Sequence, residues 1–161
     1  NNCLSDLCLA ACRDLEPFEW YLGYEKYRPF IVENVPKDAI VMMAGCGNSY
    51  MMEDMVCTLI CYALLKNSLQ LKTLYTRGLQ VEDGYTTLVG ADLSRVALRQ
   101  MKSRTSADFP EITYFQGNMM DTDLPEKSYD AIIDKGLFDS ILCSHLGEVE
   151  CAIYIQEVSG L

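Results

Sequence analysis

A pair of glycines separated by one residue is the first feature of the sequence that could bind a ligand. Gly45 and Gly47 directly follow the apolar run 39–44 (AIVMMA). Glycine lets a backbone turn approach a ligand closely, and a helix that begins after such a turn offers free amide hydrogens. Tyr50 replaces the third glycine of the dinucleotide-binding fingerprint, which disfavours a nicotinamide enzyme. A turn that only connects a strand to a helix is the alternative.

Polar side chains also stand where two later apolar runs end. Asp92 closes the run 86–91, where a carboxylate can accept hydrogen bonds from both ribose hydroxyls of a nucleoside; a solvated helix cap is the alternative. Asn118 follows the run 112–116. Its side-chain carbonyl can receive an adenine amino group and Met119 can lie against the ring, although turn chemistry explains the pair equally well.

The eight cysteines do not indicate a metal centre or a disulfide scaffold. Their spacing is scattered, and the chain is larger than the small scaffolds that depend on disulfides, so we expect reduced thiols. Cys3, Cys8 and Cys12 lack a paired C-x-x-C, and His145 is the single histidine, so no zinc site is expected.

These residues need a scaffold that gathers strand ends. A helix-compatible segment rich in aromatic residues spans 17–35, and helical patterns follow at 51–65 and at 95–104, the last capped by Ser94. The predicted strands are 39–44, 86–91, 112–116 and 129–134. Strands alternating with helices predict an α/β fold, in which helices cover both faces of a parallel sheet. Ligands of such sheets bind at the carboxyl ends of the strands.

Composition narrows the class of partner. The chain has 161 residues, half of them apolar, as expected of one globular domain that folds in water. Its 23 acidic and 13 basic residues give a net charge of −10, which disfavours nucleic acid and favours a basic protein surface or a small cation. No export signal and no membrane segment is evident, so we expect a cytoplasmic location.

Several segments, taken together and in order, resemble the methyltransferase-like family that includes lysine methyltransferases of elongation factor one alpha. They are 19–21 (EWY), 40–49 (IVMMAGCGNS), 53–56 (EDMV), 82–85 (EDGY), 91–94 (ADLS) and 129–136 (YDAIIDKG). The resemblance implies a class I methyltransferase with a Rossmann-like sheet, helices on both faces, and S-adenosyl-L-methionine over the strand ends. It also implies methyl transfer to a protein lysine, with a basic protein such as a translation elongation factor as substrate.

The resemblance also implies a set of cofactor contacts. By position they are Trp20, Gly45, Asp92, Leu93, Asn118, Met119 and Lys135, and Gly47 joins them on geometry. Trp20 can face the cationic sulfonium, although a tryptophan that only anchors a helix is commoner. Methyl transfer depends on positioning and desolvation, so no catalytic triad is expected. Asp139 is a weak candidate for orienting a neutral lysine amine, and a charge at a helix start is its favoured role.

The sequence departs from the family pattern in four places. Residues 1–16 lack the family's aromatic Tyr-Trp…Arg-Tyr element, and Asn118 replaces its aspartate. Residues 57–81 have no counterpart, so we expect an insertion there, looped out or derived from an intron. The family also continues beyond Leu161, which predicts a single partial domain, 1–161, truncated after the fourth strand. The alternative function is a catalytically inactive truncated or splice-variant fragment that acts as a binding or regulatory module.

Overall fold

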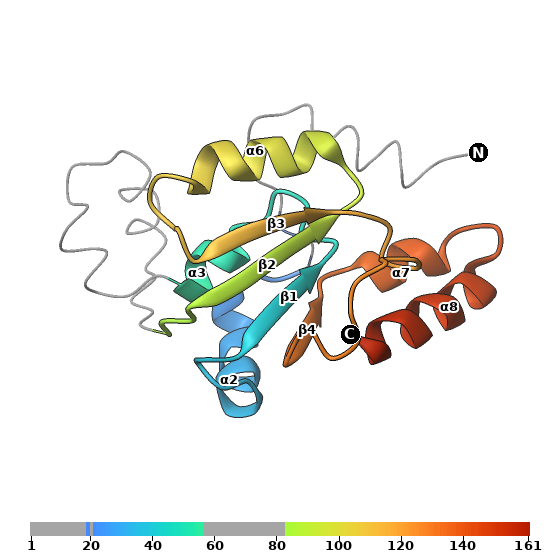
Figure 1. Ribbon diagram of the computed structural model, residues 1–161, viewed down its shortest axis with the longest axis horizontal. Coiled ribbons are helices and arrows are strands. Elements are labelled where there is room, and N and C mark those ends of the chain that lie inside the picture. The colour runs from blue at the N-terminus through green and yellow to red at the C-terminus, as the bar shows by residue number, and fades with distance from the viewer. Residues whose placement is uncertain (1–18, 20, 57–82) are drawn as a thin grey trace.

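The centre of the protein is a parallel sheet. The computed structural model describes residues 19, 21–56 and 83–161 (Figure 1). Four parallel strands lie in the order β3-β2-β1-β4, so β1 is central and pairs with both β2 and β4. Their bounds are Ile40–Ala44 (β1), Thr87–Asp92 (β2), Ile112–Gln116 (β3) and Ala131–Asp134 (β4). The predicted strands and the predicted parallel α/β architecture are confirmed.

Helices cover both faces of this sheet, as predicted. Val41 and Met43 of β1 pack into one apolar cluster with residues of α2, α3 and α6. Met42 and Ala44 point to the other face, into a cluster with residues of α7 and α8. Burial on both faces explains why β1 is a continuous apolar run. The helices are Tyr24–Asn34 (α2), Met51–Val56 (α3), Arg95–Thr105 (α6), Leu137–Leu142 (α7) and Gly147–Gly160 (α8).

The first described helix begins later than the aromatic pattern suggested. The pattern extends over 17–35, part of which lies outside the described residues, whereas α2 begins at Tyr24. Tyr21 has a positive φ of 64°, and Gly23 is an extended N-cap, so the helix cannot extend back through either residue. The end was predicted well, because Val35 is the C-cap.

The cap of α6 is the one that the sequence predicted. The Ser94 hydroxyl accepts a hydrogen bond from the backbone amide of Ala97 at 3.3 Å, which satisfies one of the free amides at the helix start. Leu98 and Met101 then pack on the sheet, and α6 contacts both β2 and β3.

The end of α3 is completed by residues that come much later in the chain. The predicted continuation of this helix to residue 65 and the predicted insertion at 57–81 lie outside the described residues. Gly84 has a φ of 67°, and the next amide, that of Tyr85, donates to the carbonyl oxygen of Met55 at 3.2 Å. A left-handed glycine followed by an amide that bonds back to a helical turn is similar to a Schellman cap, although the residues are not consecutive here.

Asp83 joins the same region to α2. Its carboxylate accepts hydrogen bonds from the Tyr24 hydroxyl at 2.6 Å and from two nitrogens of Arg28, both at 2.9 Å. Lys37 adds an ion pair at 3.1 Å. Burial alone would raise the pKa of Asp83, but the hydrogen bonds from Tyr24, Arg28 and Lys37 outweigh it and lower the pKa. No helix in the described part of the chain is long and apolar enough to cross a membrane.

Candidate functional site at the carboxyl ends of the strands

The glycine turn after β1 is tied to the end of β2. The backbone amide of Gly47 donates to Oδ2 of Asp92 at 2.8 Å, and the amide of Cys46 donates to the carbonyl of Ala91 at 3.0 Å. Gly47 has a φ of 53°, and a Cβ built on it would meet none of the described residues within 4 Å. Within the described part of the chain, the backbone at Gly47 is therefore open to the approach of a ligand.

The start of α7 packs against the glycine turn at Gly45. A Cβ built on Gly45 would lie 2.7 Å from the Cβ of Leu137, the first residue of α7. Only glycine fits at this position, because a real Cβ would displace a helix start rather than a flexible side-chain end. Gly45 is thus required for packing, whereas Gly47 is the position that faces open space.

Asp92 is held with both carboxylate oxygens in place. Oδ2 accepts from Gly47, and Oδ1 accepts from the amide of Ser94 at 2.7 Å. Burial raises the pKa of Asp92, and the backbone hydrogen bonds to it act in the opposite direction. A carboxylate has about four lone-pair sites, so two backbone bonds leave capacity for further donors. Sequence and structure agree on its position at the strand end, and its role as a ribose ligand stays a prediction.

The other predicted contacts near Asp92 differ in exposure. Leu93 is 70% exposed, so its side chain is accessible beside the end of β2. Met119 is buried in the apolar cluster that contains Met42 and Ala44 of β1. Asn118 is exposed, and its Oδ1 accepts from the amide of Met120 at 3.1 Å, so its turn role is realised. The amide of Gly117 donates to the carbonyl of Asp92 at 3.3 Å, which brings this loop to the same edge.

Lys135 lies in a group of three polar side chains that we call the polar clasp: Glu19, Ser49 and Lys135. The Lys135 ammonium contacts the Glu19 carboxylate and donates to the Ser49 hydroxyl at 2.9 Å. Glu19 also accepts from the Ser49 hydroxyl at 2.9 Å and from the Tyr50 amide at 2.7 Å. Burial lowers the pKa of Lys135 to about 8.

Arg104 of α6 is a site residue that sequence reasoning missed. Its guanidinium donates to the Asn48 carbonyl at 2.9 Å and to the Ser49 carbonyl at 2.6 Å. It also pairs with Glu53 at 2.5 Å and lies 4.2 Å from the centre of the Tyr50 ring. These contacts fix the segment between the glycine turn and α3. Nothing in the sequence marks this arginine, because a basic residue in the last turn of a helix is common.

Asp139 lies in the first turn of α7, which agrees with its predicted role as a charge at a helix start. Its Oδ2 accepts from the hydroxyl of Tyr21 at 2.5 Å. Asp134 caps the same helix, because its carboxylate accepts from the amides of Leu137 and Phe138, each at 3.0 Å. A catalytic role for Asp139 stays a prediction. Trp20 lies outside the described residues.

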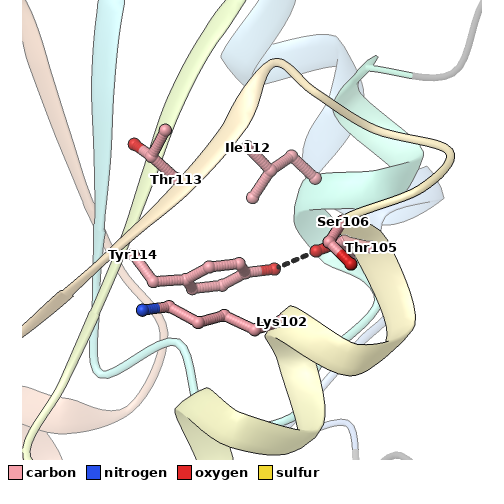
Figure 2. A pocket seen from close by; sticks show the side chains of 6 residues that line it. All are labelled: Lys102, Thr105, Ser106, Ile112, Thr113 and Tyr114. Atoms are coloured by element: carbon pink, nitrogen blue, oxygen red, sulfur yellow. Dashed lines mark hydrogen bonds between the residues drawn. The ribbon is translucent and has the colours of Figure 1, made fainter.

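A separate hollow of about 320 Å³ lies beside β3 and the end of α6 (Figure 2). Figure 2 shows the Tyr114 ring extending toward Thr105, whose hydroxyl is 2.8 Å from that of Tyr114. The hollow shares no residue with the predicted cofactor contacts. Its lining is Lys102, Thr105, Ser106, Ile112, Thr113 and Tyr114. Among the described residues, no group of three histidine, cysteine or acidic side chains could hold a metal ion.

The chain is similar in sequence and in fold to proteins named as methyltransferases. The chain is 25% identical over 130 residues to the eEF1A lysine and N-terminal methyltransferase of Bos taurus, which covers 81% of this chain. It is 28% identical over 125 residues to the Xenopus laevis protein of that name, covering 78% of this chain. A Methanosarcina mazei SAM-dependent methyltransferase superposes with a TM-score of 0.51 over 82% of this chain at 16% identity. The described part of the chain therefore has the fold of class I methyltransferases.

A second solved structure supports the same fold. A protein studied for the conversion of a disulfide bond into a thioacetal group during echinomycin biosynthesis superposes on this class I methyltransferase fold with a TM-score of 0.53 at 16% identity. That match covers 95% of this chain and 52% of the other; the Methanosarcina mazei match covers 51% of its chain. The chain spans only 15% and 14% of the two curated relatives. No family model matches it.

Proposed function

We propose that the chain binds S-adenosylmethionine at the carboxyl ends of β1, β2 and β3 and transfers its methyl group to a protein lysine. The observation that carries the proposal is the bond between Gly47 and Asp92. It places an open glycine backbone beside a carboxylate with spare acceptor capacity. That combination suits a nucleoside, whose ribose hydroxyls need an acceptor and whose sugar must lie close to the backbone.

The surrounding residues fit the rest of such a ligand. Leu93 offers an exposed apolar surface next to Asp92, on which a purine ring can rest. Asn118 offers side-chain amide hydrogens at the neighbouring loop, because its oxygen already accepts from Met120. The cofactor supplies the reactive methyl group on its sulfonium. The chain's own residues bind, orient and exclude water, which is the main requirement of in-line transfer.

A lysine acceptor is supported by the names of the relatives and by the net charge of this chain. The relatives are named as lysine and N-terminal methyltransferases of eEF1A. A net charge of −10 attracts a basic protein surface over long range. The free thiols of Cys46 and Cys151 in the described part of the chain fit a reducing compartment, so we propose a cytoplasmic encounter with this substrate.

Calorimetric titration with S-adenosylhomocysteine tests the cofactor site. We expect micromolar binding by the full chain and loss of at least about tenfold in affinity for Asp92→Ala, since a charge-assisted contact is removed. Asp38→Ala is the matched control, because Asp38 is an exposed acid just before β1, at the opposite end of that strand. Equal affinity of all three proteins, or no binding by a folded chain, would refute the site.

A second experiment tests the acceptor. Purified eEF1A is incubated with the chain and S-adenosylmethionine, and lysine methylation is mapped by mass spectrometry. We expect a methylated lysine in the presence of the wild-type chain and none with Asp92→Ala. Cofactor binding without transfer would contradict the lysine proposal and favour the inactive binding module.

A further inference from the structure

Lys135 is a buried cation whose partners come from two distant parts of the chain. The residue is 7% exposed and follows β4 directly. Its ammonium reaches Glu19, which precedes α2, and Ser49, which follows the glycine turn. A lysine is almost never buried unless it is paired, so the contact with Glu19 explains how this position can hold a cation.

Glu19 carries the contact on to the glycine turn. Its carboxylate accepts the amide of Tyr50 at 2.7 Å and the hydroxyl of Ser49 at 2.9 Å, in addition to the Lys135 ammonium. One carboxylate thus bridges the segment after β1 and the segment after β4. The polar clasp therefore joins three pieces of backbone that meet where the cofactor is proposed to bind.

A second anchor lies two residues beyond Glu19. The hydroxyl of Tyr21 donates to Asp139 of α7 at 2.5 Å. Tyr21 has a positive φ of 64°, which is rare for a bulky residue and persists only where surrounding contacts impose it. Glu19 and Tyr21 thus fasten the chain before α2 to the segments that follow β1 and β4.

We propose that Lys135 is a positioning residue that acts through Glu19 and does not itself contact the cofactor. Two of the three hydrogens of its ammonium are used by the polar clasp, and the side chain is buried beneath it. The ion pair holds Glu19 against Ser49 and Tyr50, and so sets the position of the glycine turn and of the segment before α2. This inference deepens the proposed function and rests on it for the cofactor.

The first test needs no cofactor. The chain has a single tryptophan, at position 20 between the two anchors, so quenching of its fluorescence by acrylamide reports on this segment alone. Lys135→Met and Glu19→Gln are each expected to raise the quenching constant by a similar factor. Lys135→Arg keeps the charge and is expected to stay near the wild type. Lys102→Met removes an exposed lysine of α6 and is the matched control.

The second test is a double-mutant cycle on the affinity for S-adenosylhomocysteine. Lys135→Met and Glu19→Gln are each expected to weaken binding about tenfold, as for the loss of one charge-assisted bond. The double variant is expected to weaken binding no more than either single variant does, because both substitutions break the same contact. A direct cofactor contact predicts a different pattern. Lys135→Met would then weaken binding while Glu19→Gln left it unchanged, and that result would overturn the inference.

The two readouts separate this inference from the proposed function. If the folded wild-type chain does not bind S-adenosylhomocysteine, the proposed function fails, and quenching still decides whether the clasp holds the segment. If the wild-type chain binds S-adenosylhomocysteine and all variants show equal quenching, the positioning role of the polar clasp is refuted and the proposed function stands. Circular dichroism checks that each variant folds. If Lys135→Met does not fold, the quenching and affinity of Glu19→Gln and Lys135→Arg are compared with those of the wild type instead.

Discussion

The amide of Tyr85 donates a hydrogen bond to the carbonyl oxygen of Met55 at 3.2 Å, although residues 57–82 stand between them in the sequence. Both side chains are almost fully buried and belong to the same apolar cluster. Gly84, with a φ of 67°, supplies the left-handed step that allows this bond. The last described turn of α3 thus accepts a hydrogen bond from the far side of the predicted insertion, and the flanks of that insertion are in contact.

We expect Gly84→Ala to destabilise the protein by about 1 kcal/mol, because alanine is strained in the left-handed region and recovers only part of this through chain entropy. Thermal unfolding followed by circular dichroism measures the effect. Gly160→Ala is the control, since a Cβ there, at the end of α8, meets none of the described residues within 4 Å. Equal unfolding temperatures for the two variants would contradict the cap.

Removal of residues 57–81, which joins Val56 to Glu82, is expected to preserve the fold. The join would place Glu82, Asp83 and Gly84 directly after α3, the number of residues that a Schellman cap needs before the amide of Tyr85 bonds back to Met55. Hydrogen exchange at Tyr85 and the unfolding temperature of the shortened chain are the measurements. Loss of cooperative unfolding would show that the block contributes to the core and is not an insertion.

Arg104→Met is expected to cost about 3 kcal/mol, because it leaves Glu53 buried without this cation. The side chain of Glu53 is 2% exposed, and that of Arg104 is 15% exposed. The double variant Arg104→Met/Glu53→Leu removes both charges and is expected to be more stable than Arg104→Met alone. Urea unfolding measures all three. A double variant that is less stable than the single one would argue against a buried ion pair.

The same substitution has a functional consequence. Because Arg104 binds the carbonyls of Asn48 and Ser49, its loss is expected to weaken binding of S-adenosylhomocysteine even where the variant is fully folded. Arg99→Met, at an exposed position earlier on α6, is the control for loss of a helix charge. Unchanged affinity in folded Arg104→Met would show that the glycine turn holds its shape without the arginine.

The lowered pKa of Asp83 predicts that the folded protein loses stability in acid. This pKa is lowered below the ordinary value of 3.8, so the folded protein binds fewer protons here than the unfolded chain does. The resulting stabilisation is present above the unfolded pKa and is lost as the pH falls through the folded pKa. Asp83→Asn is expected to cost about 2 kcal/mol near neutral pH, from weaker hydrogen bonds to Arg28 and Tyr24.

Unfolding by urea at a series of pH values checks this expectation. The difference between wild type and Asp83→Asn should shrink below about pH 4, because both then lack the charge. Asp38→Asn, at an exposed position, should show no such convergence. A difference that stays constant in acid would mean that Asp83 is not stabilised as a carboxylate.

The sequence predicts the sheet and part of the site because both have local signals. The buried run 39–44 becomes β1, and Asp92 ends the next buried run, so their spacing alone places them at one edge. The contact between Glu19 and Lys135 has no such signal, because its partners lie far apart in the chain. Arg104 resembles any basic residue near a helix end. Only the order of the strands brings these side chains to the glycine turn.

The packing of Leu137 against Gly45 determines when the site can form during synthesis. Gly45 leaves the ribosome long before Leu137, and at about 5–20 residues per second the interval is roughly 5 to 20 seconds. Throughout this time β1 lacks its partner β4, so one edge of an apolar strand is exposed. A nascent chain at this stage has the glycine turn without its support, and it is then most dependent on chaperones that cover such edges.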